Sequence, residues 1–164
     1  MRYSCLVPFV AAALTACSPA YGEQDGSIPE GETISPFDAN HPAIANLDPQ
    51  LRAAVQQAAT DARDRVEFRV TSGWRSKTYQ QHLLDEAVDR YGSLDRARRF
   101  VATPDTSRHV LGQAIDIGPT KADDWLIQHG AKYGLCQAYN NEMWHFELLT
   151  TPGGQCPPYR RDGD

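Results

Sequence analysis

The chain has 164 residues, of which 41% are hydrophobic and 23% are charged, and these values are ordinary for a globular protein. They exclude collagen-like, disordered and multi-span membrane proteins. The length suits one domain with its own core and is short for two. Residues 1–50 hold one basic and six acidic residues and so carry the whole net charge of -5, whereas residues 51–164 are neutral. A neutral domain lacks the basic surface of a nucleic-acid-binding protein, so we expect no nucleic-acid partner.

The first residues have the pattern of a targeting segment. Arg2 is followed by an apolar stretch from Leu6 to Leu14, which is too short to span a bilayer and suits a secretory signal. Leu14-Thr15-Ala16-Cys17 resembles the lipobox of bacterial lipoproteins, in which the cysteine is lipidated and becomes the mature N-terminus. We expect a lipoprotein signal peptide over residues 1–16 and a lipid anchor at Cys17. The alternative is an ordinary signal peptide, which would release a secreted protein.

The segment that follows, residues 17–42, combines proline, glycine and acidic residues with few large apolar side chains. Such a segment buries too little apolar surface to offset the entropy lost on ordering. It is therefore predicted to be a flexible tether between the membrane and a folded domain of residues 43–164.

Two cysteines remain in the domain once Cys5 leaves with the signal and Cys17 is lipidated or removed. In an oxidising compartment Cys136 and Cys156 are expected to pair, and the bridge would contribute on the order of 3 kcal/mol. Free thiols and thiolate metal ligands are the alternatives, but the spacing is not that of a C-x-x-C zinc motif.

The first half of the domain is predicted to be mainly helical. Asp48 caps a helix that begins with Pro49 and ends near Asp64. Residues 66–70 alternate between apolar and polar, which is typical of a half-buried strand. A second helix runs from its cap at Ser76 to Gly92, and a short helix follows before Pro104.

The second half is predicted to contain most of the sheet. A strand is expected between Gly112 and Gly118, then a helix capped by Thr120 that runs up to Gly130. Two closing strands follow, at residues 135–139 and 143–149. This order predicts an α+β domain with a small, mainly antiparallel sheet flanked by helices.

Three residues can together hold a divalent metal. His109 and Asp116 lie on either side of the Leu111-Gly112 break, so a loop and a strand can direct both side chains to one point, and His145 comes from another strand. Two imidazoles and a carboxylate suit zinc and leave a fourth position for water. Zinc at such a site makes hydroxide near neutral pH, so one Zn²⁺ ion is the expected cofactor.

Three blocks of sequence resemble the VanY-type D-alanyl-D-alanine carboxypeptidases. Residues Ser107 to Asp116 match their S-x-H-x-x-G-x-A-x-D signature, and Glu142-Met143-Trp144-His145 matches their E-x-W-H. Ser72-Gly73-Trp74-Arg75-Ser76, followed by Gln80, is similar to their S-G-Y-R-S-x-x-x-Q segment, with Trp74 where tyrosine is usual. The resemblance implies the α+β fold shared by the hedgehog domain and the DD-peptidases.

The resemblance also implies a role for each site residue. His109, Asp116 and His145 would be the zinc ligands, and Glu142 the general base. Arg75 would bind the substrate's terminal carboxylate or the developing oxyanion. Ser107 and Gln80 would contact the substrate or support the loop. Trp144 is interpreted as a core wall beside the metal, with a substrate contact as the alternative.

A second glutamate competes for the role of general base. In a regular strand Glu147 shares the face of His145, whereas Glu142 points to the opposite face. Strand geometry therefore favours Glu147, and the resemblance favours Glu142, provided that Asn140-Asn141 form a turn that leaves Glu142 outside the regular strand. We follow the resemblance and assign Glu147 an exposed or supporting position.

The activity implied by the resemblance is removal of the terminal D-Ala from peptidoglycan stem peptides by a monomer anchored outside the cell membrane. An L-Ala-D-Glu endopeptidase or a D-Ala-D-Ala dipeptidase of the same fold would carry the same zinc ligands. A noncatalytic zinc-stabilised cell-wall binding module is the alternative of another class. The carboxylate of Glu142 argues against that module, because a purely structural zinc site needs no base.

Overall fold

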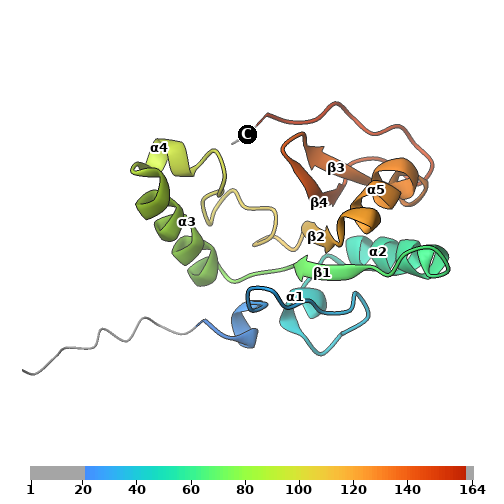
Figure 1. Ribbon diagram of the computed structural model, residues 1–164, viewed down its shortest axis with the longest axis horizontal. Coiled ribbons are helices and arrows are strands. Elements are labelled where there is room, and N and C mark those ends of the chain that lie inside the picture. Colours follow the sequence, from blue (N-terminus) through green and yellow to red (C-terminus); the bar gives the residue numbers. More distant parts are fainter. Residues whose placement is uncertain (1–20, 162–164) are drawn as a thin grey trace, which may run out of the picture.

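The computed structural model describes residues 21–161, so the predicted signal peptide and the lipidation site at Cys17 lie outside the described residues. The described helices precede the last two strands, and together the elements form one α+β unit (Figure 1). In chain order the elements are η1 (Glu23–Asp25), α1 (Pro42–Ala45), α2 (Pro49–Ala62), β1 (Arg69–Ser72), α3 (Lys77–Tyr91), α4 (Leu94–Ala97), β2 (Ala114–Gly118), α5 (Thr120–His129), η2 (Gly130–Tyr133), β3 (Leu135–Tyr139) and β4 (Glu142–Leu148).

The four strands form one antiparallel sheet in the order β1-β2-β4-β3, as the sequence predicts. Ile115 and Ile117 of β2 and Phe146 of β4 are buried in the main core together with apolar residues of α2 and α5. Neighbouring residues of a strand point to opposite faces of a sheet. Asp116 and His145 therefore lie on the face turned away from this core.

Helix α2 shows how local signals and packing agree. The Asp48 carboxylate caps its first turn by accepting hydrogen bonds from the N–H groups of Gln50 and Leu51, at 2.8 and 3.2 Å. Leu51 and Val55 are 1% exposed and face the core. Burial of one such side chain stabilises the fold by about 1.5–3 kcal/mol.

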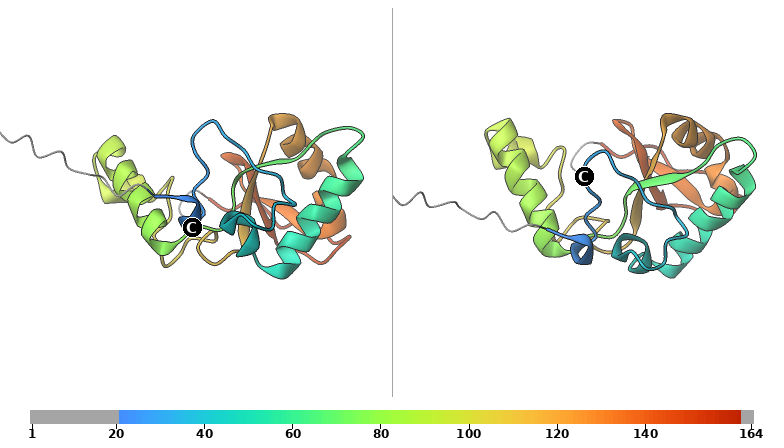
Figure 2. Two further views of the ribbon diagram at one scale, coloured as in Figure 1. Left: turned by 90° about the horizontal axis from the view of Figure 1, so that it is seen from below. Right: turned by 60° about the horizontal axis from the view of Figure 1, so that its bottom comes forward.

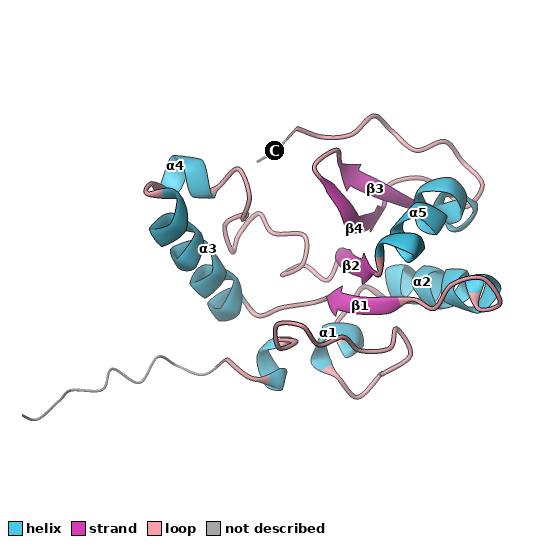
Figure 3. Ribbon diagram, in the orientation of Figure 1, coloured by secondary structure: helices cyan, strands magenta, loops and turns pink. Residues whose placement is uncertain are grey.

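Helices α3 and α4 form a pair that stands away from the sheet (Figure 2). The Ser76 hydroxyl accepts the N–H of Tyr79 at the start of α3, and Gly92 ends the helix with φ +79°, as predicted. The pair has a small core of its own, formed by Leu84, Ala87 and Ala97. The loop from α4 to β2 then returns to the sheet and carries Ser107 and His109 (Figure 3).

Several element boundaries differ from the predictions, and three of them are instructive. Strand β1 begins at Arg69, so only the end of the alternating stretch pairs with β2. Helix α4 ends at Ala97 after a single turn. Thr120 is the first residue of α5 rather than its cap, because Pro119 occupies the capping position without a side-chain hydrogen bond.

The prediction of a flexible tether over residues 17–42 is wrong for the described residues, 21–42. Ile34 and Val70 exchange two backbone hydrogen bonds of 3.0 and 2.8 Å, and the Ser76 hydroxyl donates to the Asp25 carboxylate at 2.7 Å. Ile28 and Ile34 also pack against the main core. A few well-placed isoleucines are enough to fix this segment, although its overall composition is polar.

Cys136 and Cys156 form the predicted disulfide, which ties β3 to the segment after β4. Among residues 21–161, no helix has both the length and the apolar character that crossing a bilayer requires.

Candidate metal centre

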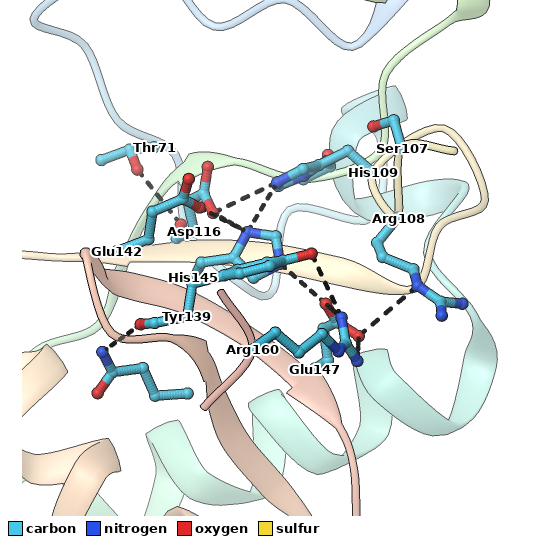
Figure 4. A network of polar contacts seen from close by, with 12 residues as sticks. Thr71, Ser107, Arg108, His109, Asp116, Tyr139, Glu142, His145, Glu147 and Arg160 are labelled. Atoms are coloured by element: carbon cyan, nitrogen blue, oxygen red, sulfur yellow. Dashed lines mark hydrogen bonds and ion pairs between the residues drawn. The ribbon is translucent and has the colours of Figure 1, made fainter. Parts of the chain in front are cut away.

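His109, Asp116 and His145 converge at one buried point (Figure 4). Asp116 and His145 are direct partners across β2 and β4, and His109 reaches them from the preceding loop. The Asp116 Oδ1 atom lies 3.4 Å from His109 Nε2 and 3.2 Å from His145 Nδ1, and these two nitrogens are 3.3 Å apart. The structure thus brings together the three ligands that the sequence predicts.

The outer nitrogen of each imidazole is held by an acceptor. His109 Nδ1 lies 2.8 Å from the carbonyl oxygen of Gly73, and His145 Nε2 lies 3.1 Å from Glu147 Oε1. Carbonyl and carboxylate oxygens only accept, so these nitrogens donate their protons outward. When both rings are neutral, as metal binding requires, the two inner nitrogens present lone pairs to each other and to Asp116.

This donor set fits a metal ion. Asp116 Oδ1 is buried and has no regular hydrogen-bond partner among the described residues. Three lone pairs facing one another repel unless a cation lies between them. Tetrahedral zinc with bonds of about 2.0–2.1 Å requires donors about 3.3 Å apart, which agrees with the separations of 3.2–3.4 Å.

The electrostatics of the three ligands also favour a cation. Burial raises the pKa of Asp116, but the two imidazoles outweigh it and hold that pKa well below its usual range. Burial and the neighbouring Arg75 lower the pKa of His109. Burial also opposes a charge on His145, yet Asp116 and Glu147 raise its pKa to about 9. The carboxylates thus create a negative potential at this point.

A cavity of about 270 Å³ opens beside the three ligands. Glu142 lines this cavity, and its Oε2 atom lies 3.6 Å from His145 Nδ1. Asn140 and Asn141 form the predicted turn, but Glu142 is the first residue of β4 and pairs with Tyr139 rather than lying outside the strand. The β3–β4 register shifts next to Tyr139, and this irregularity breaks the strict alternation that would turn Glu142 away.

Glu147 occupies a different position from Glu142. It is 3% exposed, contacts the outer nitrogen of His145, and forms two hydrogen bonds with Arg160 at 2.8 and 2.9 Å. Burial opposes its charge, but His145 and Arg160 lower its pKa to about 2. Glu147 therefore supports His145 from outside and does not line the cavity.

Arg75 lies on the cavity wall, with its Nη2 atom 3.9 Å from Asp116 Oδ2. Arg75 comes two residues after Gly73, whose carbonyl oxygen accepts the N–H of His109. Gly73 has no room for a side chain, because a Cβ atom there would collide with the backbone oxygen of Ala43. This close approach explains why glycine precedes the aromatic residue and the arginine.

Ser107 and Gln80 are buried and hydrogen-bonded to each other. The Ser107 hydroxyl donates to Gln80 Oε1 at 3.0 Å, and Gln80 Nε2 donates to the carbonyl oxygen of Ala102 at 2.8 Å. The two roles predicted for these residues were contact with the substrate and support of the loop. The observed hydrogen bonds favour support of the loop before His109.

Other residues of the site differ from the predictions or were not predicted. Trp144 is 44% exposed and lines the cavity, so its interpretation as a core wall is wrong. Arg98 and Arg99 also line the cavity. Arg160 was missed because nothing in the sequence around it marks a site.

The fold and the site define the class as an α+β protein with a buried His-Asp-His metal centre beside a cavity. The family model described as VanY, D-alanyl-D-alanine carboxypeptidase, matches residues 45–150. The chain therefore belongs to the VanY D-alanyl-D-alanine carboxypeptidase family, as its motifs predict.

Curated and solved relatives agree with this family. A D-alanyl-D-alanine carboxypeptidase of Enterococcus faecalis (strain ATCC 700802 / V583) is 29% identical in a match that covers 49% of this chain and 39% of that protein. The chain thus spans about two fifths of that relative's length.

Two solved structures are similar in fold. The VanY D,D-pentapeptidase of a VanB-type resistance cassette, in complex with Zn(II), is 26% identical with a TM-score of 0.60, covering 73% of this chain and 79% of that one. VanYB in complex with D-alanine-D-alanine is 25% identical with a TM-score of 0.61, covering 75% and 81%.

Proposed function

We propose that the protein is a zinc-dependent carboxypeptidase that removes the terminal D-Ala from peptidoglycan stem peptides. The observation that carries this proposal is the placement of Glu142 and Arg75 on the wall of the cavity beside the His-Asp-His cluster. Solved relatives that hold Zn(II) and D-alanine-D-alanine support the choice of metal and substrate.

His109, Asp116 and His145 would hold the zinc ion. When bound, zinc polarises the scissile carbonyl and lowers the pKa of a water molecule. The hydrogen bonds that the two imidazoles donate to the Gly73 carbonyl and the Glu147 carboxylate fix the orientation of the rings. A correctly oriented ring loses little entropy when it acts as a ligand.

Glu142 would act as the general base and acid. Its carboxylate is 23% exposed and lies at the cavity, so it can accept the proton of the attacking water and pass it to the leaving amine. Arg75 would bind an anionic oxygen, either the terminal carboxylate of the substrate or the oxyanion. Its Nε atom is buried without a hydrogen-bond partner among the described residues, which leaves it able to donate.

The cavity suits an acidic peptide. Four arginines line it, against the two carboxylates of Asp116 and Glu142: Arg75, Arg98, Arg99 and Arg108. Three of the four, Arg98, Arg99 and Arg108, lie on the segment that runs from the end of α4 to the loop that carries His109. A stem peptide carries free carboxylates besides its C-terminal one, and these would be attracted to that wall.

The experiment that tests the proposal is incubation of the metal-free and zinc-loaded protein with a muropeptide that ends in D-Ala-D-Ala. Release of single D-Ala by the zinc-loaded form only, detected by mass spectrometry, would support the carboxypeptidase. Cleavage elsewhere in the stem would indicate an endopeptidase, and release of D-Ala only from the free dipeptide D-Ala-D-Ala would indicate a dipeptidase. Zinc binding without cleavage of any of these substrates would indicate a binding module.

The proposed place of action is outside the cell membrane, where the stem peptides lie. We propose a lipid anchor at Cys17, supported by the lipobox-like sequence, with a secreted form as the alternative. Growth with radiolabelled palmitate tests this, because Cys17→Ser would abolish the label on the protein. A monomer is the proposed oligomeric state.

A further inference from the structure

Arg160 contacts the back of the metal centre from a segment outside the part of the chain that the family model matches. The match covers residues 45–150. Arg160 Nη1 and Nη2 donate to Glu147 Oε1 and Oε2 at 2.8 and 2.9 Å, a two-point contact that fixes the carboxylate plane (Figure 4). Glu147 Oε1 in turn accepts the outer N–H of His145 at 3.1 Å. A continuous path of hydrogen bonds therefore joins Arg160 to a metal ligand.

The burial of Glu147 makes this contact important. The Glu147 side chain is 4% exposed, so water cannot replace a lost partner at low cost. Arg108 is the other cation near it, but its Nε atom is 3.9 Å away and its Nη1 donates to Gln113. Arg160 is therefore the arginine that holds this carboxylate by two hydrogen bonds, and His145 supplies one more contact.

Three further contacts hold Arg160 in place. Its backbone N–H donates to the carbonyl oxygen of Ala138 at 2.8 Å, and its guanidinium lies over the ring of Tyr139 at 5.5 Å. Four residues before Arg160, the disulfide between Cys156 and Cys136 ties the segment to β3. The bridge and the backbone contact thus fix residues 156–160 beside the strand that leads into the site.

We propose that Arg160 is a positioning residue for the metal centre, which acts through Glu147 on the orientation of His145, and that the Cys136–Cys156 disulfide holds it there. This inference rests on the zinc site of the proposed function. Arg160 touches neither metal nor substrate, so its effect would be on metal affinity before any effect on the reaction.

The test measures zinc affinity of the full chain by competition with a chromogenic chelator, and requires no substrate. Arg160→Ala is expected to weaken zinc binding about 10- to 100-fold, the usual effect of losing a partner behind a metal ligand. Arg160→Lys would restore only part of the affinity, because an ammonium cannot hold both carboxylate oxygens in one plane. The neighbouring Arg161→Ala is the matched control and would leave affinity unchanged. Cys136→Ser/Cys156→Ser would weaken binding in the same direction as Arg160→Ala, but less.

A double-mutant cycle separates positioning from general damage to the fold. If Arg160 acts through Glu147, then Glu147→Gln/Arg160→Ala would bind zinc no more weakly than Glu147→Gln alone. The double variant also removes the unpaired buried carboxylate, so it remains informative if Arg160→Ala fails to fold. Additive losses in the cycle, or an Arg160→Ala affinity within two-fold of the wild type, would overturn the inference. If the wild type binds zinc and releases D-Ala, and the Arg160 variants bind zinc equally well, this inference alone is wrong. If the wild type binds no zinc, the proposed function is wrong as well.

Discussion

Asp116 and His145 face each other across two adjacent antiparallel strands, with Asp116 Oδ1 3.2 Å from His145 Nδ1. Direct cross-strand partners have their Cβ atoms about 4.5–5.5 Å apart, so the sheet itself sets the distance between these two ligands. The pair next to them, Ile115 and Phe146, lies in the core and fixes the register. Two of the three ligands are thus placed by the same packing that stabilises the domain.

Asp116→Asn is expected to remove most of the bound zinc, because the amide oxygen is a weaker ligand and does not balance the metal's charge. The measurement is zinc content per chain by elemental analysis after dialysis against a weak chelator. Asp95→Asn, on the exposed side of α4, is the control and keeps its zinc. A full complement of zinc in Asp116→Asn would contradict the assigned ligand set.

Glu142→Gln is expected to lower kcat by about 10²- to 10⁴-fold, the usual contribution of a general base, while zinc content is unchanged. Release of D-Ala and zinc content are measured on the same preparation. Glu147→Gln is the informative comparison, since its position behind His145 predicts weaker zinc binding rather than loss of the base. Activity that survives Glu142→Gln but not Glu147→Gln at saturating zinc would reverse the assignment.

Arg98→Ala and Arg99→Ala are each expected to raise KM for a stem peptide with extra carboxylates, with kcat little changed. The increase should be only about two- to five-fold, because both arginines are exposed and water screens their charge. The effect should shrink at high salt. Arg96→Ala is the matched control, since Arg96 lies on α4 just before these two arginines but does not line the cavity. Equal KM changes for a substrate without those carboxylates would refute an electrostatic role.

Asp61 is expected to make a pH-dependent contribution to stability. Hydrogen bonds from Lys132 and Tyr133 lower its pKa from 3.8 to about 2. A lowered pKa stabilises the folded state when the carboxylate is charged, so the contribution is complete above about pH 4 and is lost as the pH falls through about 2.

Urea unfolding of the metal-free protein at several pH values measures this contribution. The difference in unfolding free energy between wild type and Asp61→Asn should be constant near neutral pH and approach zero below about pH 2. Asp64→Asn, beyond the end of the same helix and largely exposed, should show little difference. A difference that grows on acidification would have the wrong sign for this explanation.

Most of the elements and the convergence of the three predicted ligands could be predicted from the sequence. The reason is that strong local signals agree with the pattern of buried apolar residues. Asp48-Pro49, Ser76 and Gly92 each mark a helix end by backbone chemistry that depends on few neighbours. The alternation around Asp116 placed its side chain opposite to Ile115 and Ile117. These features are local and can be read without knowing the fold.

The missed features depend on contacts between distant parts of the chain. Ile34 pairs with Val70, and Arg160 meets Glu147, but no local pattern announces either contact. The position of Glu142 depends on an irregular strand register, which simple alternation does not predict. Such tertiary contacts need the folded chain.

The division between the sheet and the α3–α4 pair has a consequence for how such a protein can change. The ion-binding residues belong to the sheet and its neighbouring loop, whereas much of the opposite cavity wall follows a helical pair with a separate small core. For the proposed peptidase, changes in the helical pair would therefore alter the preference for one peptide over another, while the chemistry performed on the bond would stay the same.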